Sequence, residues 1–159
     1  MQMKPIETMA VRLEPVPLVT VQAPIEDVER ILTHVQAIAP LAVGKYDRNS
    51  YQTAPGIERY RPLQGAAAGP EIETRERPGV IELSFQLPND SATVEQVIEA
   101  IFQVHSYQEP FITVQQVLAS RSKGLDDSAN PHRWWNTTGD WKMAGDWKMA
   151  SDRKTAGQS

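Results

Sequence analysis

Apolar and polar residues alternate most regularly from Ile81 to Leu87, in the run I-E-L-S-F-Q-L. This period of two predicts a strand with one buried face. A second strand is predicted over Leu18 to Gln22, because the prolines just before it lack the N–H that a β-ladder needs. A third, Phe111 to Leu118, alternates poorly, as an edge or interface strand does. Between them, the Tyr-rich stretch from Val43 to Leu63 contains T-A-P-G and predicts a hairpin.

Two stretches have apolar residues at helical spacing instead. Pro24 suits the first turn of the first helix, and Pro40 ends that helix. Thr93 and Gln96 have the spacing of a capping box at the start of the second helix. The first apolar stripe comprises Ile25, Val28, Ile31, Leu32, Val35 and Ile38, and the second comprises Val94, Val97, Ile98, Ile101 and Phe102, followed by His105.

The order of these elements predicts one α+β domain of the βαββαβ type, with an antiparallel sheet, two helices on one face and an extra hairpin. We expect the domain to cover residues 17–120, after an N-terminal leader over 1–16. The other face of such a sheet is uncovered, which favours self-association.

Residues 121–159 are expected to form a disordered tail, in which G-D-W-K-M-A occurs at 139–144 and again at 145–150. All four Trp residues lie in this tail. The Trp–Lys repeats are interpreted either as multivalent docking peptides for a protein partner or as a duplication without a role.

The composition excludes several classes of function. A net charge of −4 argues against nucleic acid as a partner, because counterion release requires a clustered basic surface. The absence of cysteine excludes disulfides and thiolate chemistry, and it fits a cytoplasmic location. No segment has the apolar length that would predict a membrane span.

Two motifs resemble the PII/CutA-like insert domain of YqfO-type proteins, a family of GTP-cyclohydrolase-like, dinuclear-metal hydrolases. H-S-Y-Q-E-P at 105–110 is similar to the family's H-P-Y-E-E-P, and V-G-K-Y-D-R-N-S-Y at 43–51 is similar to its I-G-x-Y-x-x-C-S-F. The resemblance covers Pro17 to Ala119. The chain departs from the pattern at Ser106, Gln108 and Asn49, where the family has Pro, Glu and Cys.

The resemblance implies a ferredoxin-like fold that assembles into homotrimers through sheet edges and exposed sheet faces. It does not imply catalysis, because the family's metal-ligand motifs, a His-His-Pro and a His/Glu pair, are not found in this chain. The first hypothesis is therefore a non-catalytic, homotrimeric binding or scaffold domain. The alternatives are a metal- or nucleotide-responsive regulator and a small hydrolase that depends on His105.

The candidate site residues come from the same two motifs. His105 is interpreted either as a structural anchor of the turn after the second helix or as a ligand. The residues by themselves indicate no definite cofactor, and the resemblance to CutA makes a divalent metal ion on His105, Asp47 and Glu109 an alternative. PII-like trimers tend to bind nucleotides between subunits, where Lys45, Arg48, Arg59 and Arg61 could face an anion. The ligand-binding candidates are Lys45, Tyr46, Asp47, His105, Tyr107 and Glu109.

Overall fold

A computed structural model describes residues 4–139. It divides into two units, with the boundary between Lys123 and Gly124, and each unit is described by itself. The elements of the first unit are β1 (Ile6–Glu7), β2 (Val11–Pro24), the 3-10 turn η1 (Ile25–Asp27), α1 (Val28–Ile38), β3 (Tyr51–Gln52), β4 (Gly56–Tyr60), β5 (Arg75–Gln86), α2 (Ser91–Val104) and β6 (Ile112–Ser122).

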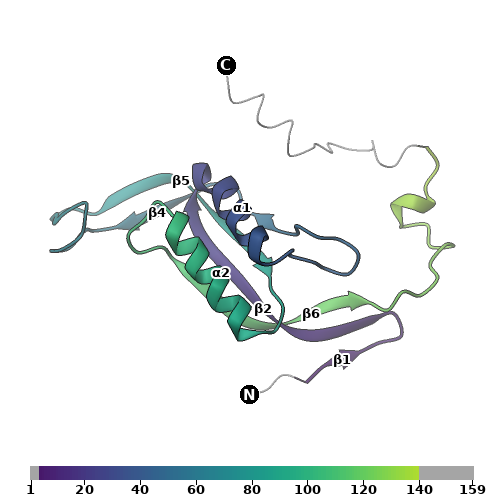
Figure 1. The fold of residues 1–159 in the computed structure, drawn as a ribbon. Coiled ribbons are helices and arrows are strands. Elements are labelled where there is room, and N and C mark those ends of the chain that lie inside the picture. The colour runs from purple at the N-terminus through teal and green to yellow at the C-terminus, as the bar shows by residue number, and fades with distance from the viewer. Residues whose placement is uncertain (1–3, 140–159) are drawn as a thin grey trace. The chain divides into compact units, whose positions relative to one another are not determined.

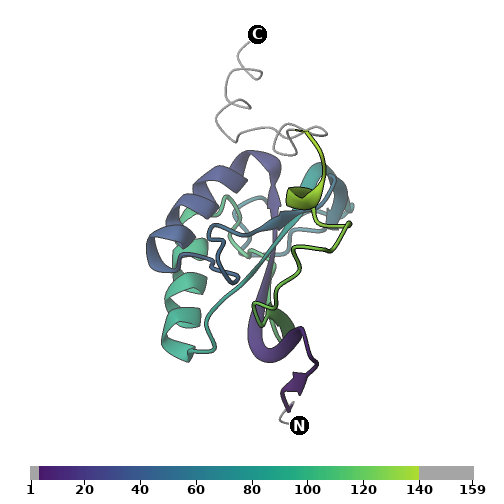
Figure 2. The ribbon, with the colours of Figure 1, turned by 90° about the vertical axis from the view of Figure 1, so that its right-hand side faces the viewer.

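The strands form one antiparallel sheet with the order β6–β2–β5, and β3 and β4 follow each other along the outer edge of β5. β1 forms a short extra hairpin with the start of β2. Both helices cover the same face of the sheet (Figures 1 and 2). The predicted ferredoxin-like α+β fold is therefore confirmed. The fully buried core residues include Val19, Val21, Ile31, Val35, Leu83, Val97 and Ile101.

The prediction that β2 begins at Leu18 was wrong, because the strand begins at Val11 and its first half includes Pro15 and Pro17. The carbonyl of Pro17 accepts a bond from Leu87 N–H, on the side of β2 where β5 lies, so the missing N–H of Pro17 faces that side too. Pro15 has the same orientation, since side-chain and backbone directions repeat every second residue. β5 pairs with β2 only from Leu18 onward, so neither proline interrupts a ladder.

The predicted hairpin in residues 43–63 is also absent. β3 and β4 both pair antiparallel with β5, so they run in the same direction and form one interrupted edge strand. Thr53 continues the pairing, since its N–H donates to the Glu82 carbonyl at 3.0 Å. Pro55 then stops it, because proline has no N–H to donate.

The Arg-Pro-Gly sequence at residues 77–79 is typical of a turn but lies inside β5. Gly79 has a φ of +79°, and the pairing with β4 shifts register beside it, between Gly56 and Ile57. Gly79 is therefore the extra residue of a β-bulge, a position that favours glycine because of its positive φ.

The cap of α2 differs from the predicted capping box at Thr93. The helix begins at Ser91, and the Asp90 carboxylate accepts bonds from the N–H groups of Ala92 and Thr93 and from the Thr93 hydroxyl. These hydrogen bonds, first those from Thr93, hold the pKa of Asp90 below its usual range. An aspartate satisfies two terminal N–H donors at once, so it is the better cap.

The second unit is described from Gly124 to Gly139 and contains the 3-10 turn η2 (Trp134–Asn136). The Asn136 side-chain amide donates to the carbonyls of Asp127 and Asn130, at 2.9 and 2.8 Å. These residues, expected to be disordered, therefore form a hydrogen-bonded turn. From Asp140 onward the Trp–Lys repeats lie outside the described residues, so a partner for them stays a prediction.

Within residues 4–139, no helix combines the length and the apolar character that crossing a bilayer requires.

Candidate functional site

His105 ends α2 and is nearly buried, with 9% of its surface exposed. Its Nε2 lies 2.8 Å from the Gln22 carbonyl on β2, and its Nδ1 accepts the Tyr107 N–H at 3.0 Å. A carbonyl can only accept and an N–H can only donate, so these bonds define a neutral imidazole protonated on Nε2. Both ring nitrogens are thus occupied within the chain, and His105 anchors the turn between α2 and β6.

Asp27, in η1, is the most buried charged residue described, with 1% of its surface exposed. Its carboxylate accepts the Ser106 N–H at 2.9 Å, the Ser106 hydroxyl at 2.7 Å and a guanidinium N–H of Arg30. Arg30 also donates to the Val104 carbonyl, the last of α2, at 2.7 Å. One carboxylate therefore joins the start of α1 to the end of α2.

The pKa of Asp27 reflects two opposing effects. Burial raises it, but the hydrogen bonds from Ser106 and Arg30, together with the charge of Arg30, outweigh burial and hold it below the usual range. Asp27 is therefore a carboxylate paired for structure, and the deep burial does not leave it protonated.

Tyr107 joins the turn after α2 to β4. Its hydroxyl donates to the Glu58 carboxylate at 2.7 Å, and the Arg77 guanidinium lies 5.6 Å from its ring centroid. Arg77 also forms an ion pair with Glu26 at 2.9 Å. Burial, and then the bond to the Glu58 carboxylate, raises the pKa of Tyr107, so its hydroxyl stays protonated.

Gln108 extends the pattern, because its side-chain oxygen accepts the Ala67 N–H at 2.9 Å. The four consecutive residues 105–108, which we call the corner, thus bond to four separate segments: β2, η1, β4 and the connector between β4 and β5. Glu109 follows with an exposed side chain. The corner is a structural junction, with its polar groups engaged inside the domain.

The other sequence motif forms the loop after α1. Lys45, Tyr46 and Asp47 are exposed there, next to a tight turn in which Val43 and Tyr46 exchange backbone hydrogen bonds at 2.7 and 3.1 Å. The Asn49 amide donates to the carbonyls of Leu41 and Tyr46, at 3.0 and 2.9 Å. Asn49, which departs from the family pattern, therefore holds the loop closed.

The structure does not bring the two motifs together. His105 bonds to Gln22 near the end of β2, whereas the loop follows the opposite end of α1 and lies beside Leu87, at the end of β5. Asp47 is thus separated from His105 and Glu109. In residues 4–139, no group of three or more His, Asp or Glu side chains is placed to hold a metal ion.

The proposed anion-facing residues are also dispersed along the fold. Lys45 and Arg48 lie in the loop after α1, Arg59 lies on β4 and Arg61 follows it. Arg59 forms an ion pair with Glu76 at 2.9 Å.

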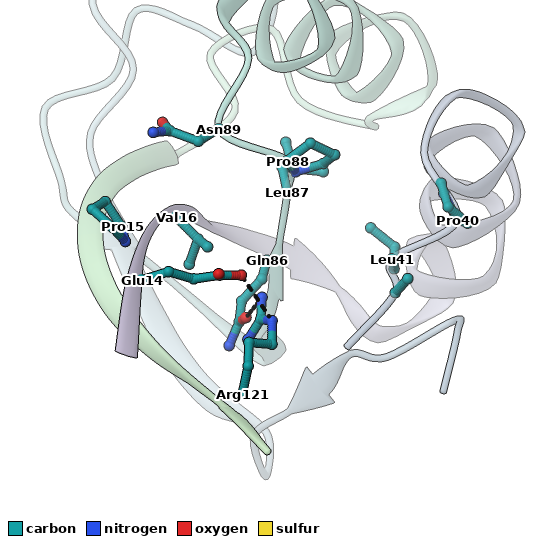
Figure 3. Close-up of a pocket in the computed structure, with 11 residues that line it drawn as sticks. Glu14, Pro15, Val16, Pro40, Leu41, Gln86, Leu87, Pro88, Asn89 and Arg121 are labelled. Carbon is teal, nitrogen blue, oxygen red and sulfur yellow. Dashed lines mark hydrogen bonds and ion pairs between the residues drawn. The ribbon is translucent and has the colours of Figure 1, made fainter. Parts of the chain in front are cut away.

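A cavity of about 390 Å³ lies beside the loop after α1, at the end of the sheet (Figure 3). Pro40, Leu41 and Leu87 form its apolar wall. On its polar side, Arg121 faces Glu14 at 3.3 Å and donates to the Gln86 side chain at 3.0 Å, as the dashed lines show. The charges of this cavity are therefore already paired with each other.

Sequence reasoning missed Asp27 and Asn49. An acidic residue at the start of a helix is explained by the helix dipole alone, and Ser106, which binds Asp27, is 79 positions away in sequence. The signal that was available is the pair of departures from the family pattern. Ser106 supplies an N–H and a hydroxyl where proline has neither, and Asn49 supplies an amide.

No protein-family model matches the chain, and no curated protein sequence matches it. Among solved structures, a Bacillus cereus protein related to NIF3 aligns with a TM-score of 0.54 and 17% identity, over 66% of this chain and 26% of that one. The aligned region is therefore about a quarter of the Bacillus protein.

Two CutA structures also align. The periplasmic divalent cation tolerance protein CutA from Archaeoglobus fulgidus has a TM-score of 0.46 and 16% identity, over 65% of this chain and 84% of its own. The PII-like protein CutA from Nostoc sp. PCC 7120 has a TM-score of 0.43 and 20% identity, over 64% and 80%. The fold assignment rests on the strand order and the Bacillus structure, and membership of the YqfO-type family stays a prediction.

Proposed function

We propose that this chain is a non-catalytic binding or scaffold domain with a PII/CutA-like fold that works as a homotrimer. The observation that supports it best is a difference in charge between the solvent side of the helix layer and the uncovered face of the sheet. The polar groups of the corner are engaged within the chain, whereas the centre of the uncovered sheet face presents side chains poor in charge.

The uncovered face is made by alternate residues of three strands. Thr20 and Ser84 form a hydrogen bond across β2 and β5 at 3.0 Å, and Gln22 and Glu82 form another at 3.0 Å. The centre of this face comprises Leu18, Thr20, Gln22, Glu82, Ser84, Gln86, Thr113, Gln115 and Val117, of which Glu82 alone is charged. Farther along β2 and β6, Glu14 and Arg121 lie on the same face and are paired with each other.

The helix layer differs, because its solvent side carries Glu29, Arg30, Glu95 and Glu99. Depletion of charge is the compositional mark of an interface core. A second and third copy of the chain are the partners that the resemblance to trimeric PII/CutA-like domains implies.

The test is the mass of the full-length chain in solution, measured by native mass spectrometry and by light scattering at micromolar concentration. We expect three copies of the 17.8 kDa chain. A monomer over the whole accessible range would contradict the proposal. A metal or nucleotide that stays bound in the native spectrum would favour the regulator instead.

A matched pair of variants locates the contact. Thr20→Arg places a charge at the centre of the uncovered face, so we expect it to dissociate the trimer. Thr33→Arg makes the same substitution on the exposed surface of α1 and is expected to leave the mass unchanged. Circular dichroism checks that both variants remain folded.

A further inference from the structure

Within the first unit, β6 is an edge strand of the sheet. In the part of the chain that the structure describes, it pairs with β2 alone, in unbroken register from Ile112 to Ser122. The Gln22 N–H donates to the Phe111 carbonyl, so the backbone groups of the odd-numbered residues of β6 bond inward to β2. The N–H and carbonyl groups of even-numbered residues such as Val114, Gln116 and Leu118 therefore point outward.

Between Ile112 and Ser120, the sequence of β6 does not protect that edge. Natural edge strands are usually interrupted by proline, by charged side chains or by a bulge, because an open row of backbone groups pairs with any available strand. From Ile112 to Ser120, β6 contains no charge, no proline and no glycine, and the structure records no register shift. Val114 exposes 43% of its surface on this edge.

The opposite edge of the sheet has such protection. Pro55 interrupts it between β3 and β4, and β4 presents Glu58 and Arg59. This edge is therefore a poor partner for β6, which leaves a second β6 as the complementary edge within the described domain.

We propose that β6 pairs antiparallel with β6 of a second copy around a two-fold axis at Gln116, which extends the sheet across the two chains. In this register Val114 lies opposite Leu118 of the partner subunit. Gln116 meets its own counterpart, so the two side-chain amides can bond to each other. Arg121 lies opposite the partner's Phe111, so no like charges face each other.

This inference goes beyond the proposed trimer, because it pairs the same edge strand of two copies around a two-fold axis, and a three-fold arrangement contains no such axis. The two contacts predict different copy numbers. A face contact alone gives three copies, a β6 contact alone gives two, and both together give six.

The first test exploits the absence of cysteine from the chain. In the full-length protein, Gln116→Cys is the variant whose thiols meet across the axis, since residues opposite each other in a hydrogen-bonded pair lie about 5.5 Å apart between Cα atoms. A short bifunctional thiol cross-linker should then give a covalent dimer at low micromolar concentration. Gln103→Cys, the same substitution at an exposed position of α2, controls for random collision.

A dimer that forms with Gln116→Cys and not with Gln103→Cys supports the β6 pairing. Equal yields, or no dimer, overturn it. A protein that is trimeric by mass but is not cross-linked at residue 116 overturns the β6 pairing and leaves the proposed function intact, whereas a cross-linked two-copy species does the reverse.

The second test removes a single outward N–H. Gln116→Pro should weaken the β6 contact at least about tenfold, because proline cannot donate, while the inward ladder to β2 is left intact. Gln116→Ala loses the same side chain, including its bond to Asn89, but keeps the N–H. Similar dissociation constants for the two variants would overturn the pairing.

Discussion

The two ends of the helix layer are held in different ways. At the corner, Ser106 donates to the buried carboxylate of Asp27, which lies 79 positions away in sequence. At the opposite end, the loop after α1 is closed by Asn49 through neutral bonds to residues no more than eight positions away. We infer that the corner fixes the tertiary arrangement of both helices and β6, whereas the loop is a local closure whose loss stays local.

The largest effect should follow from Asp27→Ala. This change leaves the N–H and hydroxyl of Ser106 without the buried carboxylate that accepts from them and removes one of the two main acceptors of Arg30, so we expect a loss of about 3 kcal/mol in the free energy of unfolding. Urea denaturation at fixed protein concentration measures it, since association adds to stability. Glu29→Ala, on the exposed side of α1, is the control and should change the stability by less than about 0.5 kcal/mol.

A smaller loss, about 2 kcal/mol, is expected for Ser106→Pro, which restores the residue of the family pattern. His105 already has the extended backbone that precedes proline, with φ −76° and ψ 142°, so the cost comes from the two lost bonds to Asp27. Ser106→Ala keeps the N–H and should lose roughly half as much. If proline and alanine proved equal, the backbone bond to Asp27 would have no measurable role.

Asn49→Ala should cost about 1 kcal/mol, because two carbonyls lose a neutral donor close to solvent. The decisive measurement is amide hydrogen exchange. We expect faster exchange in the loop after α1 and unchanged exchange in α2 and β6. Faster exchange throughout the domain would remove the distinction between the two ends.

The smallest expected effect is a pH dependence confined to the corner. The pKa of Asp27 is lowered in the folded state, so its contribution is present above the pKa of an unfolded aspartate, about 3.9, and is lost as the pH falls toward the folded value. The wild type should therefore lose more stability than Asp27→Asn between pH 6 and 3. Parallel curves would show that Asp27 has equal pKa values in both states.

The sequence predicted the elements whose burial repeats regularly. The stripes of α1 and α2 and the alternation from Ile81 to Leu87 are local patterns, and each corresponds to a buried face. The predictions failed where a residue type occurs in two kinds of structure, as proline does when it either interrupts a strand or lies in one with its nitrogen facing no partner strand. Prolines 15 and 17 predicted that the strand starts only at Leu18, yet their nitrogens face a side of β2 where β5 does not pair with them, which only the register reveals.

The candidate site was predicted less well, because its geometry depends on contacts between distant segments. H-S-Y-Q-E-P pointed correctly to a junction at His105 but did not reveal that Asp27 is its centre. Lys45, Tyr46 and Asp47 were grouped with His105 through the resemblance alone, and the structure places them at the opposite end of α1. A motif indicates which residues have a role, but it does not indicate which motifs lie close together in the folded chain.

The distribution of proline along the sheet bears on how large an assembly can become. Pro15, Pro17 and Pro55 remove donors from the margin of the sheet that lies away from β6. Two-fold pairing through β6 would cover the unprotected sheet edge of both molecules at once. Growth by strand addition would therefore end at the first union, and the sheet could not propagate into a fibre.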